Sequence, residues 1–474
     1  MMPTWLSLLP PLITIAMAIW SRQILPSLLV GLLVGCYLLH PTATGGLETA
    51  VDQILRTLLD EGNLQVLLFL YLFSGLVELA GRAGGIKAFS NFAEKHIKSE
   101  RGVFFVLWAL IPVTFIDCGF RVVAAGSITR GLAEKHKIAR ARLAFMLNNT
   151  SSPVVELIPI ATTFVGFNLV IIAQGLKGAG LSQDTAAYAI WLRAIPFEFF
   201  SIVLLAFTLL SVFFQFGKAA PGQGDRDATT AEGKKAMDMS PAETVIAPRV
   251  INLVVPMLSV IVLTFFFFWF FGKDRPGNDS VLSAMAHTEP NKAMLTSLFI
   301  ALLISGVLYL LQKYSLEAMT SDVVSGGNKI MPTLAILILA WPLAAVAGDL
   351  GLNGFVQQQL GRSLPGWSVP VSLFVVSSTV TYFIGSGWGA ASLLMPVAIP
   401  LAASAQVGIP LCVAAVITGG TFGDVTSPVA GMTNMASNVA RADHAAYLRY
   451  ARPYNLTAAG VAAVLFLVAG FLGW

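Results

Sequence analysis

The chain has 474 residues, of which 56% are hydrophobic and only 11% are charged, and its formal net charge is +4. About a quarter of the residues of a soluble globular protein are charged, so this composition excludes an ordinary water-soluble enzyme. The basic residues lie beside apolar stretches rather than along one helix face, and we expect no nucleic-acid partner.

Apolar stretches of membrane-spanning length recur along the whole chain. Examples are residues 5–20, 24–39, 64–80, 250–271 and 295–311. With its flanks, each is long enough to cross about 30 Å of hydrocarbon as an α-helix. A backbone in lipid must satisfy its own hydrogen bonds, and the sequence lacks the alternating strand patterns of outer-membrane proteins. We therefore predict an all-α, multi-pass membrane protein that is embedded in the lipid bilayer.

Two short motifs occur twice, in the same order. The sequence FIDCGF at residues 115–120 reappears as FIGSGW at 383–388, and TSSPV at 150–154 reappears as VTSPV at 425–429. Two such pairs with similar separation favour an internal duplication over chance. The sequence therefore predicts two homologous halves.

The predicted halves, residues 1–215 and 250–474, are joined by a polar linker at 216–249 that has no apolar face to bury. Each half contains one segment that we interpret as a re-entrant hairpin, at about residues 102–130 and 369–404. Glycine and short polar residues near the middle of each segment permit the tight turn that such a hairpin needs. About ten transmembrane helices then remain.

The basic residues are distributed unequally in this topology. Twenty-one Lys and Arg residues fall on the side of the linker and six on the opposite side. By the positive-inside rule, the linker is cytoplasmic and both termini face the periplasm. The basic loop at 81–101 corresponds to residues 349–368, where Arg362 is the only basic residue, so we expect the two repeats to have inverted topology. Inverted repeats are a recurring design of secondary transporters, and we expect such a carrier in the bacterial inner membrane.

The sequence does not indicate an enzyme. It shows no recognisable pair of nucleophile and base, and Cys36, Cys118 and Cys412 lie in apolar segments without the spacing of metal ligands. We expect no cofactor beyond Na⁺ or H⁺ as the coupling ion.

Four segments interrupt apolar spans with polar residues, glycine or proline. Two are the hairpin tips around Asp117 and Ser386, and two are the polar runs at 148–153 and 421–428, where proline removes a backbone donor. Irregular backbone at membrane depth is tolerated where it lines a cavity, and there carbonyl groups and helix N-termini bind ions. The candidate substrate- and ion-binding residues are Asp117, Gly119, Arg121, Asn148, Asn149, Thr150, Ser151, Glu156, Gly385, Ser386, Gly387, Asp424, Thr426, Ser427 and Asn434.

Two of these residues carry carboxylates inside apolar segments. Burying Asp117 or Asp424 in a bilayer is costly, which favours a functional role over an internal ion pair. Hard cations take oxygen ligands, and the four interrupted segments supply carboxylates, amides and hydroxyls. The Na⁺ candidates are Asp117, Asn149, Ser386, Asp424 and Thr426.

Two further charged residues lie close to the interrupted segments. Arg121 follows Asp117 by four residues, and it either neutralises that carboxylate or binds an anionic solute. Glu156 follows Pro153 by three residues and is a candidate proton carrier, because burial disfavours the charged form of a carboxyl group.

Other conspicuous side chains are interpreted without a role in transport. Glu78, Glu198 and Asp349 lie near predicted span ends, where water can solvate them. The phenylalanine run at residues 265–268 is interpreted as packing that faces lipid.

At the interrupted segments the sequence resembles the NhaC family of Na⁺/H⁺ antiporters, part of a wider superfamily of ion transporters with paired re-entrant hairpins and unwound helices. The resemblance covers most of the chain and is carried by residues 115–145, 148–160, 384–402 and 419–434. It implies proton exchange through carboxylates in the membrane. It also implies Na⁺ ligation around Asp117, Ser386, Asp424, Thr426 and Ser427.

The chain departs from the pattern of that family where Cys118, Asn149 and Gly431 stand in place of acidic residues. Arg121 and Glu156 are, conversely, charges that the pattern does not contain. Na⁺/H⁺ antiport is the leading hypothesis. The alternative is a Na⁺- or H⁺-coupled carrier of a small anionic or zwitterionic solute, held by Arg121. Because elevator-type carriers are often dimers, we expect a homodimer.

Overall fold

The computed structural model consists of α-helices joined by short connections. It describes residues 5–88, 91, 97, 99–159, 162–181, 184–214, 244–273, 289–355 and 364–474. No β-strand occurs among these residues. The predicted all-α fold is therefore confirmed.

The helices before residue 215 are η1 (Trp5–Leu8), α1 (Leu9–Ser21), α2 (Ile24–Leu39), α3 (Gly45–Leu58), α4 (Glu61–Arg82), α6 (Glu100–Ala109), α7 (Ile111–Thr114), α8 (Cys118–Lys135), α9 (Arg140–Asn149), α10 (Ser152–Leu157), α11 (Thr163–Gly178), α12 (Asp184–Ala194), η2 (Ile195–Phe197) and α13 (Phe199–Phe213). Those after residue 243 are α14 (Ile251–Gly272), α16 (Pro290–Leu310), α17 (Leu316–Lys329), α18 (Met331–Asp349), α19 (Leu352–Phe355), η6 (Gly366–Ser368), α21 (Val369–Ile384), α22 (Gly387–Ser404), α23 (Ile409–Thr426), α24 (Gly431–Ala440) and α25 (His444–Phe471).

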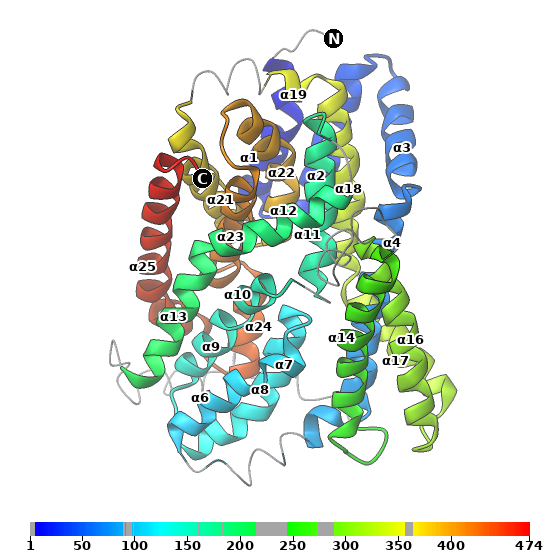
Figure 1. Ribbon diagram of the computed structural model, residues 1–474, viewed down its shortest axis with the longest axis vertical. Helices are drawn as coiled ribbons and strands as arrows, with labels where there is room; N and C mark the ends of the chain where they lie inside the picture. Colours follow the sequence, from blue (N-terminus) through cyan, green and yellow to red (C-terminus); the bar gives the residue numbers. More distant parts are fainter. Residues whose placement is uncertain are drawn as a thin grey trace.

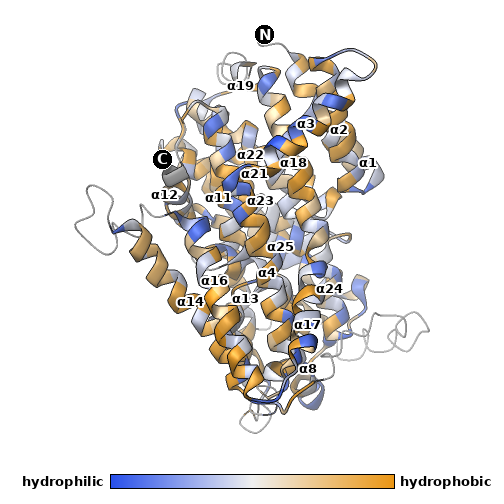
Figure 2. Cartoon of the chain, turned by 90° about the vertical axis from the view of Figure 1, so that its right-hand side faces the viewer, coloured by the Kyte–Doolittle hydropathy of each residue, from blue (hydrophilic) through white to orange (hydrophobic). Residues whose placement is uncertain are grey.

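Many of these helices have the length and apolar character of membrane spans. Within the described ranges eight helices qualify, or up to nine if the bent pair α12–α13 forms one span. Three further apolar helices are shorter, namely α1 together with η1, α2, and α11. Figure 2 shows hydrophobic residues along most of α14, and the side chains of Phe265, Phe266 and Phe270 on this helix are exposed. Such a surface suits lipid rather than water. The chain is a multi-pass membrane protein.

The first helices of the two predicted halves pack in corresponding ways. α1 packs against α2, and α14 packs against α16. α2 and α3 both pack against α18, whereas α16 and α17 both pack against α4. Suppose that α1, α2, α3 and α4 correspond, in this order, to α14, α16, α17 and α18. Each of these contacts then has a counterpart in which the two halves have changed places, as two related halves require. Their boundaries at 1–215 and 250–474 stay a prediction, and the predicted linker at 216–249 falls largely outside the described residues.

Segments predicted to lie on the cytoplasmic side contact one another. Arg82 Nε lies 3.2 Å from Asp322 Oδ1, and Val245 N donates to Arg82 O at 3.1 Å. Arg140 Nη1 donates to Arg441 O at 3.4 Å and so joins two further basic segments. α1 and the end of α25 both lie in the upper half of Figure 1, as expected if both chain ends face the same side.

Two helix groups have the form of the predicted hairpins. The first consists of α6, α7 and α8, interrupted at residues 115–117, and the second consists of α21 and α22, interrupted at residues 385–386. In Figure 1, α6 and α8 lie at the lower end of the molecule and α21 and α22 lie in its upper half, so the hairpins approach the middle from opposite ends. α21 with η6, and α22, are themselves among the helices long enough to span a membrane. Their re-entrant character stays a prediction.

Candidate ion-binding site

Asp117 is the N-cap of α8, at the tip of the first hairpin. Its Oδ1 accepts a hydrogen bond from Phe120 N at 2.8 Å, as a capping carboxylate does. Its Oδ2 accepts from Thr163 Oγ1 at 3.1 Å, and Thr163 N donates to Ile116 O at 3.0 Å. The hairpin tip is therefore held against the start of α11, with the Asp117 carboxylate at the positive end of the α8 dipole.

Asp424 occupies the corresponding place at the second hairpin. Ser386 caps α22, and its Oγ accepts from Gly389 N at 3.1 Å. The Asp424 carboxylate comes from α23, and its Oδ1 accepts from the N–H of Gly387, the first residue of α22, at 3.0 Å. Each hairpin thus has a carboxylate at the N-terminus of its second arm. The first hairpin supplies its own, and α23 supplies the other.

The start of α11 lies against both hairpins. Its Phe167 stacks on Trp388 of α22, with ring centroids 4.5 Å apart, and Phe164 meets the same indole edge-on at 5.4 Å. Cys118, the residue after Asp117, belongs to a small hydrophobic cluster that includes Phe164 of α11 and Trp388 of α22. The two carboxylates therefore belong to one region of the molecule.

The break after α9 is tied to the first hairpin and to α23. Ser151 Oγ donates to Cys118 O at 2.6 Å, which joins the break to the beginning of α8. Asn148 Nδ2 donates to Tyr447 Oη at 2.7 Å and lies 3.5 Å from Asp424 O. The first break thus lies beside the backbone that carries the Asp424 carboxylate.

Asn455 of α25 links the two predicted breaks. Asn149 Nδ2 donates to Asn455 Oδ1 at 2.9 Å, and Asn455 Nδ2 donates to Val425 O at 2.8 Å and to Thr426 Oγ1 at 3.3 Å. The first break therefore reaches the end of α23 through an amide bridge.

Four buried oxygen atoms in this region have no hydrogen-bond partner among the described residues, and one of them is Ser152 Oγ. The other three are potential ligands on side chains that approach α23 or α25. They are Asn148 Oδ1, Asn149 Oδ1 and Thr381 Oγ1. Thr381 packs against Gly423, the residue before Asp424. Because buried polar atoms are nearly always paired, unpaired acceptors beside a carboxylate are candidate ligands for a cation.

Arg121 is fully buried, and backbone carbonyl groups take most of its hydrogen bonds. Nε donates to Thr150 O at 2.5 Å, Nη2 donates to Leu107 O at 3.1 Å, and Nη1 donates to Thr114 Oγ1 at 2.8 Å. Among the described residues no ion pair joins Arg121 to Asp117, so the interpretation that Arg121 neutralises this carboxylate does not match the structure. Arg121 instead ties both arms of the first hairpin to the break after α9.

Glu156 lies inside the protein, as its position three residues after Pro153 suggested. Its Oε2 accepts from Ser201 Oγ at 2.6 Å, and its Oε1 accepts from Thr421 Oγ1. Thr421 precedes Asp424 by three residues, or about one helical turn, on α23. The structure thus brings Glu156 into the neighbourhood of the second hairpin.

The interpretation of Glu198 as a solvated residue is wrong. Glu198 is fully buried, because the α12–α13 pair bends by 45° at this residue and places it between two apolar segments. Glu78, by contrast, is partly exposed and lies 2.6 Å from Lys329 Nζ. Asp349 accepts from Gln53 Nε2 at 3.1 Å at an exposed position, as expected near a span end.

The remaining candidates have local partners. Thr150 Oγ1 donates to Met146 O at 2.7 Å, and Asn434 Nδ2 donates to Ala430 O at 2.9 Å. Two other candidates, Ser427 and Gly119, lie where neighbouring helices approach each other closely. Ser427 Oγ donates to Tyr382 O at 2.6 Å, and Gly119 lies near Met435 of α24.

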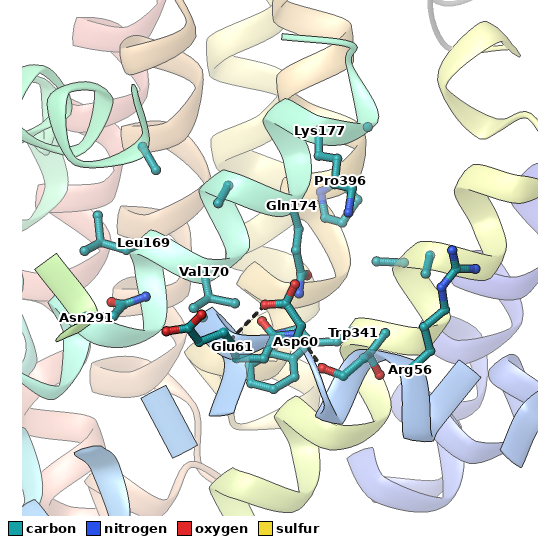
Figure 3. A pocket seen from close by; sticks show the side chains of 18 of the residues that line it. Arg56, Asp60, Glu61, Leu169, Val170, Gln174, Lys177, Asn291, Trp341 and Pro396 are labelled. Carbon is teal, nitrogen blue, oxygen red and sulfur yellow. Dashed lines mark hydrogen bonds between the residues drawn. The ribbon is translucent and has the colours of Figure 1, made fainter. Parts of the chain in front are cut away.

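A cavity of about 1310 Å³ lies between α3, α4, α16 and α18 on one side and α11 and α22 on the other. Figure 3 shows Arg56, Asp60, Glu61 and Gln174 among the side chains that line it. None of the candidate residues named from the sequence lines this cavity. Its lining does include Leu169, which follows Thr163 by six residues, or about 9 Å along α11. We call this cavity the vestibule.

Gly385 provides a test of how closely the second hairpin meets the α23–α24 connection. Its φ is 76°, and an added Cβ would lie 2.8 Å from Val429 O. Gly385→Ala is expected to destabilise the protein by about 1–3 kcal/mol from the left-handed backbone alone. The measurement is thermal unfolding in detergent. Gly431→Ala is the matched control, because an added Cβ there meets nothing within 4 Å. Equal unfolding temperatures for the two variants would contradict this packing.

Two hairpins whose tips meet interrupted helices inside a multi-pass bundle define the class of secondary membrane transporters. The model of the Na⁺/H⁺ antiporter family matches residues 154–471. The chain belongs to the Na⁺/H⁺ antiporter family.

Two individual proteins are similar to the chain. The chain is 27% identical to an uncharacterized protein of Haemophilus influenzae, over 98% of this chain and 91% of that protein. It is 24% identical to the malate-2H⁺/Na⁺-lactate antiporter of Bacillus subtilis, over 37% of this chain and 38% of that protein.

Two solved transporters share the fold at low sequence identity. The YdaH transporter of Alcanivorax borkumensis superposes with a TM-score of 0.62 and 14% identity, over 90% of this chain and 89% of that chain. MtrF of Neisseria gonorrhoeae superposes with a TM-score of 0.58 and 12% identity, over 89% of this chain and 84% of that chain.

Several residues of this region were not identified from the sequence. Asn455 is a polar residue within the long apolar helix α25, two residues after Pro453, and that pattern was a usable signal. Glu198 likewise follows Pro196 by two residues inside a long apolar run. Thr163 gave no such signal, because a threonine at the start of a helix is common. Thr421 lies in the predicted polar run at 421–428 but was not named as a candidate.

Proposed function

We propose that this protein exchanges Na⁺ for H⁺ across the bacterial inner membrane and is of the NhaC type. Na⁺ binds in the region where the hairpin tips meet the interrupted helices. Alternating access results from movement of the hairpin-bearing core against the helices α1 to α4 and α14 to α18, by an elevator or rocking motion.

The observation that carries this proposal is that two carboxylates lie in the same region as buried oxygen atoms that have no hydrogen-bond partner among the described residues. Asp117 and Asp424 sit at the N-termini of α8 and α22, and the side-chain oxygens of Asn148 and Asn149 are buried without hydrogen-bond partners among the described residues. The Asn148 amide lies 3.5 Å from Asp424 O. Carboxylate, amide and hydroxyl oxygens suit a hard cation. Unwound segments at the membrane midplane bind Na⁺ in other carriers.

Competition between Na⁺ and H⁺ follows from the local charge balance. In the described part of the chain neither Asp117 nor Asp424 forms an ion pair, and Arg121 donates to backbone carbonyls instead. A carboxylate in a low-dielectric site without a protein cation is neutralised by a proton or by a bound metal ion. The same carboxylate therefore carries either ion, but not both together.

The vestibule provides the route to the site. Its charged lining includes Arg56, Lys177 and Lys292, which the sequence predicts on the periplasmic side. In the proposed cycle this structure corresponds to the state in which the periplasmic path is open.

The test uses purified protein in sealed vesicles with an internal pH dye. An imposed Na⁺ gradient is expected to move protons in the opposite direction, and vesicles without protein are the control. Asp117→Asn should reduce this movement strongly. A separate thermal-shift measurement with Na⁺, Li⁺ and K⁺ reports binding, since a ligand of the folded state raises the unfolding temperature. Antiport is excluded if Na⁺ stabilises the parent protein but moves no protons.

A second candidate function is coupled transport of small carboxylates, as the name of the Bacillus subtilis relative suggests. The carboxylate of the solute would have to break the hydrogen bonds of Arg121 to Thr150 and Leu107 if Arg121 held it. The same vesicles distinguish the two functions. Proton movement that requires added malate or lactate favours this candidate, and movement with Na⁺ alone favours antiport.

A further inference from the structure

Glu198 is a buried acid for which the structure provides no partner. It lies between η2 and α13, and neither carboxyl oxygen has a hydrogen-bond partner among the described residues. An unpaired carboxylate in such a place would cost several kcal/mol. Its position therefore calls for a bound proton or another ligand.

The neighbour of Glu198 is Glu156. Ser201 follows Glu198 by three residues on α13, and its hydroxyl donates to Glu156 Oε2 at 2.6 Å. This hydrogen bond places the Glu156 carboxyl group beside the first turn of α13, which Glu198 precedes directly. On its other side, Glu156 accepts from Thr421, one helical turn before Asp424. Glu198, Glu156 and Asp424 thus form a row, with hydroxyl groups of Ser201 and Thr421 beside the middle carboxyl group.

Among the described side chains of the elements around this row, none supplies a compensating positive charge. α23 and α25 present Phe422 and Phe466 to the start of α13, with ring centroids 5.6 Å and 4.9 Å from those of Phe200 and Phe199. Arg193 of α12 is exposed.

At the opposite end of α13, Arg142 of α9 pairs with Glu100 of α6 and donates to Ser211 O at 3.0 Å. In the described part of the chain, the contacts of these elements therefore bring one further charged group, that of Glu156, to the start of α13. Two such acids cannot both be ionised in a dry interior without a large cost.

We propose that Glu198 is a second proton-binding residue, which shares a proton with Glu156 and thereby supplies Asp424 during transport. Both acids of the pair are protonated while Na⁺ neutralises Asp424. When Na⁺ leaves, one proton passes from Glu156 to the Asp424 carboxylate, and Glu156 and Glu198 share the proton that remains. A proton from water then restores the pair. This inference rests on the proposed Na⁺/H⁺ exchange.

The test compares Glu198→Gln, which has the same shape but no titratable proton, with Glu198→Asp, which keeps the carboxyl group. Glu48→Gln is the control, because Glu48 is an exposed acid on α3. Infrared spectra of the purified proteins report protonated carboxyl groups by their C=O stretching band. The band is expected to lose intensity in Glu198→Gln and to shift but persist in Glu198→Asp.

Transport provides the second readout. Na⁺-driven proton movement by Glu198→Gln should fall about tenfold, less than for a group that transfers the proton directly, while Na⁺ still raises the unfolding temperature. Glu198→Asp should recover part of the movement. Parent-like proton movement together with an unchanged infrared band in Glu198→Gln would overturn the proposal.

The infrared and transport measurements together distinguish failure of this inference from failure of the proposed Na⁺/H⁺ exchange. If the parent moves no protons with Na⁺, the proposed function fails, and the infrared band still decides whether Glu198 holds a proton. If Glu198→Gln does not fold, an unchanged carboxyl band in Glu198→Asp counts against the proposal, and a shifted band supports it.

Discussion

Asp424→Asn is expected to abolish Na⁺-driven proton movement while the protein stays folded. The amide keeps the acceptor that binds Gly387 N at 3.0 Å, so the contact between α23 and the second hairpin remains. It loses the charge that attracts Na⁺ and the group that takes up the proton. The rate in vesicles should fall by at least about a hundredfold, as for loss of a positioned proton-transfer group. The stabilisation of the protein by Na⁺ should disappear as well.

Asp443→Asn is the matched control for this variant. Asp443 caps α25, with its Oδ1 accepting from Ala446 N at 2.7 Å, and asparagine caps helices equally well. This control should transport like the parent protein. If Asp424→Asn also transports like the parent, Asp424 does not bind the exchanged ions, and the proposed site is in the wrong place.

Arg121→Gln is expected to destabilise the whole first hairpin rather than to remove one step of transport. Three hydrogen bonds of the guanidinium join α6, α7 and the break after α9. The shorter glutamine leaves the carbonyl groups of Thr150 and Leu107 unpaired in a buried place. The expected loss of stability is about 2–5 kcal/mol, measured as a lower unfolding temperature in detergent and a lower yield of folded protein.

Arg193→Gln serves as the control, because Arg193 is an exposed arginine of a membrane segment. It should have little effect on stability. A different result for Arg121→Gln would be equally informative. A variant that unfolds at the parental temperature but has lost only solute-dependent transport would identify Arg121 as a ligand of an anionic solute.

The positions of three interruptions were predictable from local chemistry, whereas the fourth was expected at 421–428 and α23 stays helical through Thr426. Glycine at residue 385 adopts a φ of 76°, which other residues avoid, and proline at residue 153 begins a new short helix after the break. Such preferences act over a few residues, so a sequence reveals them without the fold. The prominence of Asp117 and Asp424 as acids in apolar segments has the same local origin.

The partners of these residues were not predictable in the same way. The sequence placed Arg121 four residues from Asp117, at the spacing of one helical turn, yet its hydrogen bonds go to Thr150 and Leu107. Glu198 was expected in water because it lies near a predicted span end. The bend at this residue carries it into the interior instead.

By itself the sequence determined that this protein lies in a lipid bilayer and that its fold is all-α. The length of its apolar stretches indicates membrane spans, and a backbone in lipid must form its own hydrogen bonds, as a helix does. It also marked the places where helices are interrupted. Only the tertiary structure decided which interruptions meet, as when Asp424 accepts from Gly387, which lies 37 positions earlier in the chain. Contacts of this kind depend on how whole helices pack, and no local preference encodes which buried donor a carboxylate will find.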